Sequence, residues 1–143
     1  MYEELKEEIK LHEGFVPRTY ADSLGKKTIG YGHLCVEPEQ WDDDKEYTKE
    51  ELNVVFEKDF NEALKNAEHL IGERSINDTA KEVIIEMVFQ LGIGGVGKFK
   101  KMWSALDNKD YGEASFQMMD SLWAKQTPNR AEKLSQKMRS AKT

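Results

Sequence analysis

FVPRTYADSLGKKTIGYGHL, residues 15–34, is the stretch that decides the fold. Aromatic and β-branched residues lie on both sides of Asp22-Ser23-Leu24-Gly25, a run of residue types that favours a tight turn. It is the only segment of the chain with a convincing strand pattern. We therefore predict a β-hairpin or small meander over residues 15–34.

The rest of the chain has mainly helical periodicity. Thr48-Lys49-Glu50-Glu51 has the pattern of a capping box, which predicts the start of a long helix ending near Gly72. The glycines within 92–97 predict a break between two helices. Thr127-Pro128 predicts the start of the last helix, with threonine as N-cap and proline in the first turn. The remaining predicted helices cover residues 2–12, 79–91, 98–107 and 110–122.

Length and pattern together predict one α+β domain. The chain has 143 residues, which is typical of a single domain and enough to bury a core without a metal or a disulfide. We expect a small lobe over residues 13–48, a connecting helix over 49–72, and a helical lobe made of 73–143 together with 1–12. A cleft is expected between the two lobes.

The composition indicates a soluble globular protein. Hydrophobic residues make up 38% of the chain and charged residues 34%, as in ordinary folded domains. No apolar run is long enough for a membrane span, and the acidic N-terminus does not resemble a signal peptide. The single cysteine, Cys35, excludes an internal disulfide and fits a reducing compartment.

Charge is distributed unevenly along the chain. The net charge of −6 divides into −9 for residues 1–72 and +3 for residues 73–143. Near the C-terminus the basic residues are either a solvated helix face or a surface for an anionic polymer. Duplex nucleic acid is not expected as a partner, because the chain lacks a broad basic footprint. These basic residues are Lys125, Arg130, Lys133, Lys137, Arg139 and Lys142.

Two motifs resemble cofactor-binding or metal-binding sites but lack features that such sites require. Residues 92–97 read GIGGVG, which matches the dinucleotide-binding fingerprint, but no strand is predicted before them and no parallel sheet after them. Asp42-Asp43-Asp44 lacks the glycine and the distant glutamate of a calcium loop. We therefore expect neither a cofactor nor a metal.

Two carboxylates near the hairpin are candidates for acid–base chemistry. Glu13 ends the first predicted helix, where the helix dipole favours a protonated carboxyl and so a general acid. Asp22 lies in the predicted turn, and Thr28 begins the next strand. A general acid facing a carboxylate and an oriented water would suit glycoside hydrolysis. The alternative is that Asp22 only stabilises the turn and that Glu13 is an ordinary helix ending.

The same residues belong to a longer pattern. Glu13-Gly14 followed by Tyr20-x-Asp22-x-x-Gly25-x-x-Thr28-Ile29-Gly30-Tyr31-Gly32-His33 resembles the catalytic signature of the phage-type lysozymes, glycoside hydrolase family 24. Residues 87–99 and 123–131 resemble two motifs of the helical lobe in the T-even phage members of that family. The three blocks occur in the family's order and cover most of the chain.

This resemblance implies a lysozyme-like fold and hydrolysis of the β-1,4 bond between N-acetylmuramic acid and N-acetylglucosamine in peptidoglycan. Glu13 would be the general acid, while Asp22 and Thr28 would hold the attacking water and cause inversion. Inversion requires carboxyl groups about 6.5–9.5 Å apart. His33 and Asp59 would form a structural ion pair that raises the pKa of His33. Arg130 would reach Glu13, and the sugar cleft would be lined by Leu34, Phe89, Gln90 and Gln117.

The resemblance also implies a biological setting. We expect a monomeric phage or prophage endolysin that stays in the cytoplasm of the host bacterium until a holin-like partner permeabilises the membrane. Its partner would be the glycan strands of peptidoglycan, with no insertion into the membrane. The alternative is a non-catalytic peptidoglycan-binding module on the same fold.

Overall fold

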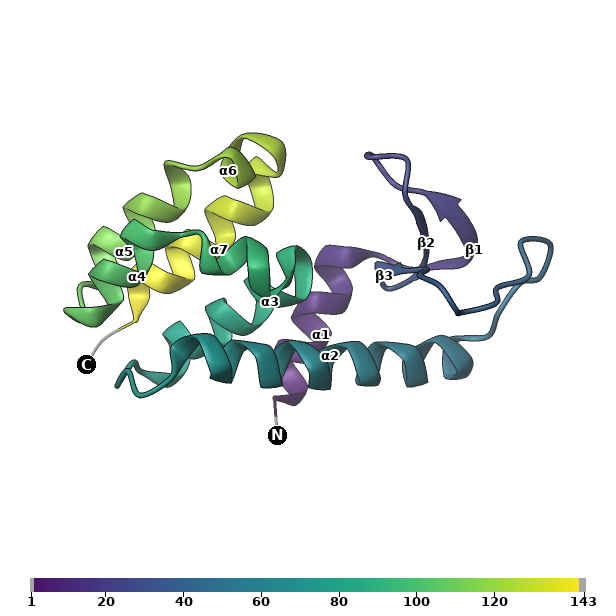
Figure 1. Ribbon diagram of the computed structural model, residues 1–143, viewed down its shortest axis with the longest axis horizontal. Coiled ribbons are helices and arrows are strands. Elements are labelled where there is room, and N and C mark those ends of the chain that lie inside the picture. The colour runs from purple at the N-terminus through teal and green to yellow at the C-terminus, as the bar shows by residue number, and fades with distance from the viewer. Residues whose placement is uncertain (1, 142–143) are drawn as a thin grey trace. The chain divides into compact units, whose positions relative to one another are not determined.

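The computed structural model describes residues 2–141, so Lys142 lies outside the described part, and it confirms the predicted α+β class (Figure 1). The chain divides into two compact units, residues 1–62 and 63–143. The contacts group the first helix with the first unit, and the predicted lobe boundaries remain a prediction. The elements in chain order are α1 (Glu3–Glu13), β1 (Val16–Ala21), β2 (Lys27–Gly30), β3 (His33–Leu34), α2 (Lys49–Ile71), α3 (Asp78–Gly97), α4 (Lys100–Asp107), α5 (Tyr111–Met119), α6 (Leu122–Gln126) and α7 (Pro128–Ser140).

The first unit contains a three-stranded antiparallel meander in the order β1-β2-β3. Tyr20 on β1 lies opposite Thr28 on β2, and Thr28 lies opposite Leu34 on β3. Residues that are directly opposite in a sheet share a face. Tyr20, Thr28 and Leu34 therefore form one row across a single face of the sheet.

Helix α1 packs on the N-terminal part of α2 within the first unit. Its residue Ile9 is fully buried. Lys6 Nζ lies 2.8 Å from Glu57 Oε1, and Lys10 Nζ lies 2.7 Å from Asn53 Oδ1. These contacts fix the helix whose last residue is Glu13.

The predicted capping box at the start of α2 is confirmed. The backbone N–H of Glu51 donates to Thr48 Oγ1 at 3.1 Å, and the backbone N–H of Thr48 donates to Glu51 Oε1 at 3.1 Å. These two bonds satisfy backbone donors that the first helical turn leaves without partners. The long helix therefore begins where the sequence predicts.

The second unit is helical. Helix α3 supplies a row of fully buried side chains that includes Val83, Ile84, Ile85 and Met87. Helix α7 packs against both α3 and α5, and α4 packs against α5. Helix α3 thus contributes much of this unit's buried apolar surface, as its apolar sequence indicates.

Two details of the second unit differ from the sequence prediction. The predicted break between two helices occurs at Gly92, which has φ +80°, but it is confined to that residue, and the helix resumes up to Gly97. Thr127 precedes α7 but does not cap it with its side chain. Its hydroxyl donates instead to the carbonyl of Trp123 at 3.1 Å, which closes the short helix α6 that the prediction missed.

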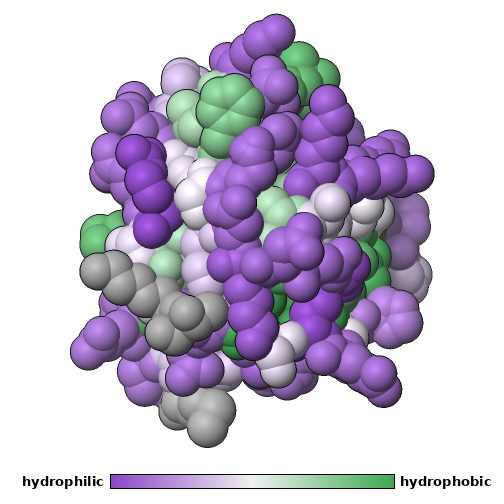
Figure 2. All heavy atoms as spheres, turned by 90° about the vertical axis from the view of Figure 1, so that its left-hand side faces the viewer, coloured by the Kyte–Doolittle hydropathy of each residue, from purple (hydrophilic) through white to green (hydrophobic). Residues whose placement is uncertain are grey.

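The surface of the molecule is largely polar. Figure 2 shows hydrophilic side chains over most of one face, with a few separate hydrophobic patches. Exposed apolar side chains of the helical unit include Phe116 at 62% and Leu122 at 67% exposure. Within residues 2–141, no helix is both long enough and apolar enough to cross a membrane.

Candidate active site

Glu13 is the last residue of α1, and its side chain is partly buried. Gly14 follows it with φ +75°, and the Gly14 N–H donates to the carbonyl of Lys10 at 2.9 Å. The helix ends here because Gly14 takes a positive φ that residues with a side chain rarely adopt. The helix end therefore holds the Glu13 side chain at the edge of the β1–β3 meander.

Asp22 occupies the predicted turn between β1 and β2. Its Oδ1 accepts from the backbone N–H groups of Leu24 at 2.9 Å and Lys26 at 2.8 Å. The carboxylate thus has the turn-forming role that its position suggests. Its second oxygen, Oδ2, makes no hydrogen bond within residues 2–141 and remains able to accept one.

Thr28 is buried on β2, with 4% of its surface exposed. Its Oγ1 donates to the carbonyl of Lys26 at 3.0 Å. With its proton used in this way, the hydroxyl oxygen can act as an acceptor. The Thr28 hydroxyl oxygen can therefore accept one hydrogen bond from a water whose other O–H donates to a carboxylate.

The phenol of Tyr20 interacts electrostatically with both carboxylates. Burial raises the pKa of its phenol, and the negative charges of Glu13 and Asp22 raise this pKa further. Both carboxylates therefore act on one phenol, which shares its sheet face with Thr28. Tyr20, which the sequence analysis did not select, therefore interacts electrostatically with Glu13 and Asp22 and lies opposite Thr28 in the sheet.

Three of the predicted sugar-contacting residues lie in the helical unit. Phe89 and Gln90 are partly buried on α3, and Gln117 is partly buried on α5. Gln90 Oε1 accepts from Trp123 Nε1 at 3.0 Å, which fixes the amide of Gln90. Gln117 Nε2 lies 3.4 Å from Glu113 Oε1, one helical turn away. Leu34, in the first unit, is 43% exposed on β3.

Arg130 takes part in a buried ion pair on the helical side. Its Nε donates to Glu86 Oε2 at 3.2 Å, with side-chain exposures of 11% for Arg130 and 0% for Glu86. The sequence analysis missed Glu86. The available signal was an acid with apolar residues on both sides, 83–85 before it and 87–89 after it, because a buried charge needs a partner. The expected contact between Arg130 and Glu13 remains a prediction.

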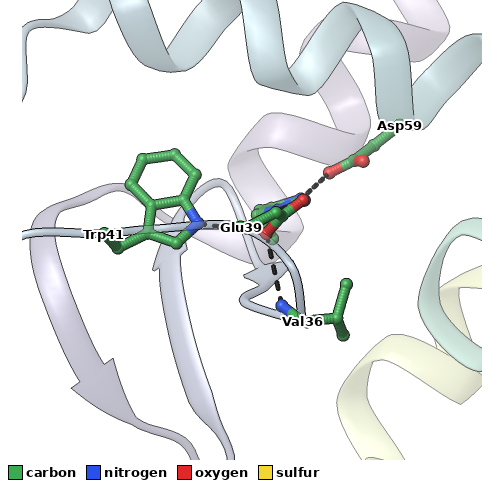
Figure 3. A network of polar contacts seen from close by, with 5 residues as sticks. Val36, Glu39, Trp41 and Asp59 are labelled. Atoms are coloured by element: carbon green, nitrogen blue, oxygen red, sulfur yellow. Dashed lines mark hydrogen bonds and ion pairs between the residues drawn. The ribbon is translucent and has the colours of Figure 1, made fainter.

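His33 is held between two carboxylates in the first unit. Its Nδ1 lies 2.7 Å from Asp59 Oδ2, and its Nε2 lies 3.0 Å from Glu39 Oε1. Figure 3 shows Glu39 near the centre of a polar network that includes Val36, Trp41 and Asp59. Glu39 accepts from the backbone N–H of Val36 at 3.2 Å and from Trp41 Nε1 at 3.0 Å. The sequence analysis missed Glu39, which no local pattern distinguishes from the neighbouring acids.

This network shifts the ionisation of its members. The hydrogen bond to Asp59 is the main cause that raises the pKa of His33 to about 9 from 6.5, against the opposing effect of burial. Burial alone would raise the pKa of Glu39, but the hydrogen bonds from Trp41, His33 and Val36 together lower it. His33 is therefore a cation at neutral pH and joins β3 to α2.

The acidic loop and the glycine string have other structural roles. No group of three or more His, Cys, Asp or Glu side chains within residues 2–141 is arranged to hold a metal ion. Asp43 instead forms an ion pair with Lys27 at 2.6 Å. The string at 92–97 is the C-terminal part of α3. The residues before it are helical, whereas a dinucleotide fingerprint requires a strand before it.

Comparisons with known proteins agree with this geometry. The family model described as phage lysozyme matches residues 10–141. Two proteins of Dictyostelium discoideum, named probable T4-type lysozymes 1 and 2, are 30% and 28% identical to the chain, with 94% of the chain and 92% of each relative covered. The pre-baseplate central spike protein Gp5 of Enterobacteria phage T4 is 28% identical over 91% of the chain, which corresponds to 26% of that protein.

Proposed function

Because the chain belongs to the phage lysozyme family and is a glycoside hydrolase of the lysozyme type, we propose that it is an inverting muramidase. Its substrate is bacterial peptidoglycan. The bond that it hydrolyses is the β-1,4 linkage between N-acetylmuramic acid and N-acetylglucosamine. Glu13, Asp22 and Thr28 carry out this reaction.

In the proposed mechanism Glu13 donates its proton to the glycosidic oxygen as the bond to the sugar C1 breaks. A water held by Asp22 and Thr28 attacks C1 from the opposite face. The proton lost by this water passes to the Asp22 carboxylate. One attack from the opposite face inverts the configuration at C1, as expected for an acid and a base on either side of a sugar.

The observation that carries the proposal is the environment of Tyr20. The negative charges of Glu13 and Asp22 both raise the pKa of the Tyr20 phenol, and Tyr20 lies opposite Thr28 in the sheet register. Two further features favour the same roles. Asp22 uses Oδ1 for the turn, which leaves Oδ2 for a water, and the Thr28 hydroxyl donates a hydrogen bond to the backbone carbonyl of Lys26.

We also propose substrate-binding residues within each unit. Leu34 presents an exposed apolar side chain beside Thr28, suited to the apolar face of a sugar. In the helical unit Phe89, Gln90 and Gln117 bind further sugars. Arg130 is a further proposed substrate-binding residue, and its ion pair with Glu86 restricts where its guanidinium can lie.

The proposed biological role is lysis of a bacterial host as an endolysin. The protein acts as a monomer, without a cofactor, and remains in the cytoplasm until a holin-like partner opens the membrane. In that case purified protein added to intact Gram-negative cells gives little lysis. Cells whose outer membrane has been permeabilised are lysed rapidly.

The direct test is digestion of purified peptidoglycan, followed by mass spectrometry of the fragments and NMR of freshly formed ends. The proposal predicts fragments that end in reducing N-acetylmuramic acid and carry the α-anomer first. Binding without new reducing ends would favour the non-catalytic binding module. A β-anomer as the first product would contradict the inverting mechanism and leave the muramidase assignment intact.

A further inference from the structure

We infer that Gly32 is a positioning residue for the proposed acid, and that its missing side chain creates the space occupied by the Glu13 carboxylate. The inference rests on the proposed role of Glu13. It adds a residue in the turn between β2 and β3 to the catalytic machinery. Gly32 acts through Glu13 and touches no reacting atom itself.

The close approach of the two residues is the first observation. A Cβ atom built on Gly32 would overlap Glu13 Oε1, lie 3.0 Å from Glu13 Cδ and lie 3.4 Å from Glu13 Cγ. All three nearest neighbours of that hypothetical Cβ therefore belong to one side chain. The Glu13 carboxylate occupies the volume that any other residue type at position 32 would fill.

The turn that carries Gly32 is anchored on both sides. The Tyr31 ring packs on Phe15 with 5.0 Å between ring centroids and on Phe56 with 5.6 Å. On the other side of Gly32, His33 forms an ion pair with Asp59 at 2.7 Å. The backbone at position 32 is thus held in place and cannot easily retreat from an added side chain.

Gly30 reinforces this anchoring. It has φ +65°, and a Cβ on it would lie 3.4 Å from Leu52 Cβ on α2. The turn is therefore pressed against α2 at one glycine and against Glu13 at the other. In contrast to the turn, the end of the Glu13 side chain has rotatable bonds and can move.

We therefore expect the substitution Gly32→Ala to move the Glu13 carboxylate and to leave the backbone of the turn in place. A displaced acid no longer meets the glycosidic oxygen at hydrogen-bond distance. A misplacement of about 1 Å can lower a rate roughly a hundredfold. We expect kcat to fall tenfold or more, by this order-of-magnitude rule, while KM changes little.

A matched control separates this effect from backbone strain. Gly32 has φ +75°, so alanine there is strained whatever the space. Gly72 at the end of α2 also has a left-handed φ, +58°, but a Cβ there would meet only the His69 carbonyl oxygen at 3.9 Å. Gly72→Ala therefore measures the strain alone, and it should lower Tm by about as much as Gly32→Ala with kcat unchanged.

The experiment combines kinetics on peptidoglycan with ¹³C NMR of the Glu13 carboxyl. For Gly32→Ala we expect a lower kcat together with a changed Glu13 carboxyl shift and titration curve, and for Gly72→Ala neither change. Asparagine tolerates left-handed φ better than other side chains, so Gly32→Asn repeats the test if the alanine variant does not fold.

The outcomes distinguish the two claims. An unchanged Glu13 signal in Gly32→Ala, or failure of both position-32 variants to fold while Gly72→Ala folds, would overturn the inference. A changed Glu13 signal in Gly32→Ala, together with a wild-type protein that does not hydrolyse peptidoglycan, would support the positioning of Glu13 and contradict the proposed function.

Discussion

His33 Nδ1 lies 2.7 Å from Asp59 Oδ2, and this contact joins strand β3 to helix α2. The side chains are 13% and 24% exposed, so solvent screens the pair only in part. Glu39 lies on the other ring nitrogen at 3.0 Å. The imidazolium is thus held between two carboxylates that come from different parts of the chain.

The first prediction concerns the pH dependence of stability. The pKa of His33 is about 9 in the folded state, against 6.5 in the unfolded chain. A raised pKa gives a stabilisation that is complete below about pH 6.5 and is lost as the pH rises through about 9. Allowing for solvent screening, the loss is on the order of 2 kcal/mol.

The measurement is urea denaturation of wild type and His33→Gln across this pH range. Lysines and tyrosines that titrate near the upper limit affect both proteins and cancel in the difference. The advantage of wild type over the variant should shrink between about pH 6.5 and 9. A constant difference would show that the charge on His33 does not stabilise the fold.

The second prediction concerns Glu39. Glu39→Gln removes one of the two negative charges that contact His33, while the amide oxygen of glutamine can still accept from Trp41 Nε1. We expect NMR titration to give a pKa of His33 below that of wild type but still above 6.5, because Asp59 remains. The pKa of Glu39 is lowered in the folded protein, so its ionised carboxylate stabilises the fold at pH values above its ordinary pKa. The stability advantage of wild type over Glu39→Gln should therefore decrease as the pH falls into the acid range. An unchanged His33 titration would contradict the network.

The third prediction concerns the buried pair Arg130–Glu86. Arg130→Met leaves the Glu86 charge buried without this partner, at a cost of about 3–5 kcal/mol in unfolding free energy. The double variant Glu86→Leu/Arg130→Met removes both charges and should regain most of that loss.

Lys137→Met is the control for this pair. It breaks the more exposed ion pair between Lys137 and Glu82 on the same two helices. Its cost should be below about 1 kcal/mol. Equal losses for Arg130→Met and Lys137→Met would show that burial of Glu86 does not govern the result.

The fourth prediction tests the capping box of α2. Thr48→Ala removes the oxygen that accepts from the Glu51 N–H and should lower the unfolding free energy by about 1 kcal/mol. Thr48→Ser keeps that oxygen and should be close to wild type, with both variants followed by thermal unfolding. Equal destabilisation by serine and alanine would mean that the lost methyl group, not the cap, is responsible.

Local patterns predicted the elements that depend on neighbouring residues. The turn at Asp22–Gly25 and the box at Thr48–Glu51 are both set by side chains that bond to backbone within a few residues. The meander was predictable from its aromatic and β-branched residues and from turn chemistry. The signature around Glu13 and Asp22 pointed to the correct family before any geometry was known.

Partners distant in sequence were not predictable in this way. Glu86 meets Arg130 across 44 residues, and nothing next to Glu86 encodes that meeting. Gly32 was predicted only as part of a motif, and only the structure shows that its missing side chain leaves space for Glu13. The continuation of α3 beyond Gly92 also depends on packing, because glycine by itself disfavours a helix.

The central claim is that Glu13 supplies the proton that breaks the glycosidic bond. It is tested most directly by the initial rate of reducing-end release from purified peptidoglycan for wild type, Glu13→Gln and Glu4→Gln, the last carrying an exposed glutamate substitution on the same helix. The account predicts that Glu13→Gln lowers the rate by a factor on the order of 10²–10⁴ while Glu4→Gln matches wild type. A rate for Glu13→Gln within about twofold of an active wild type would contradict the account, since that loss falls far short of the contribution of a general acid.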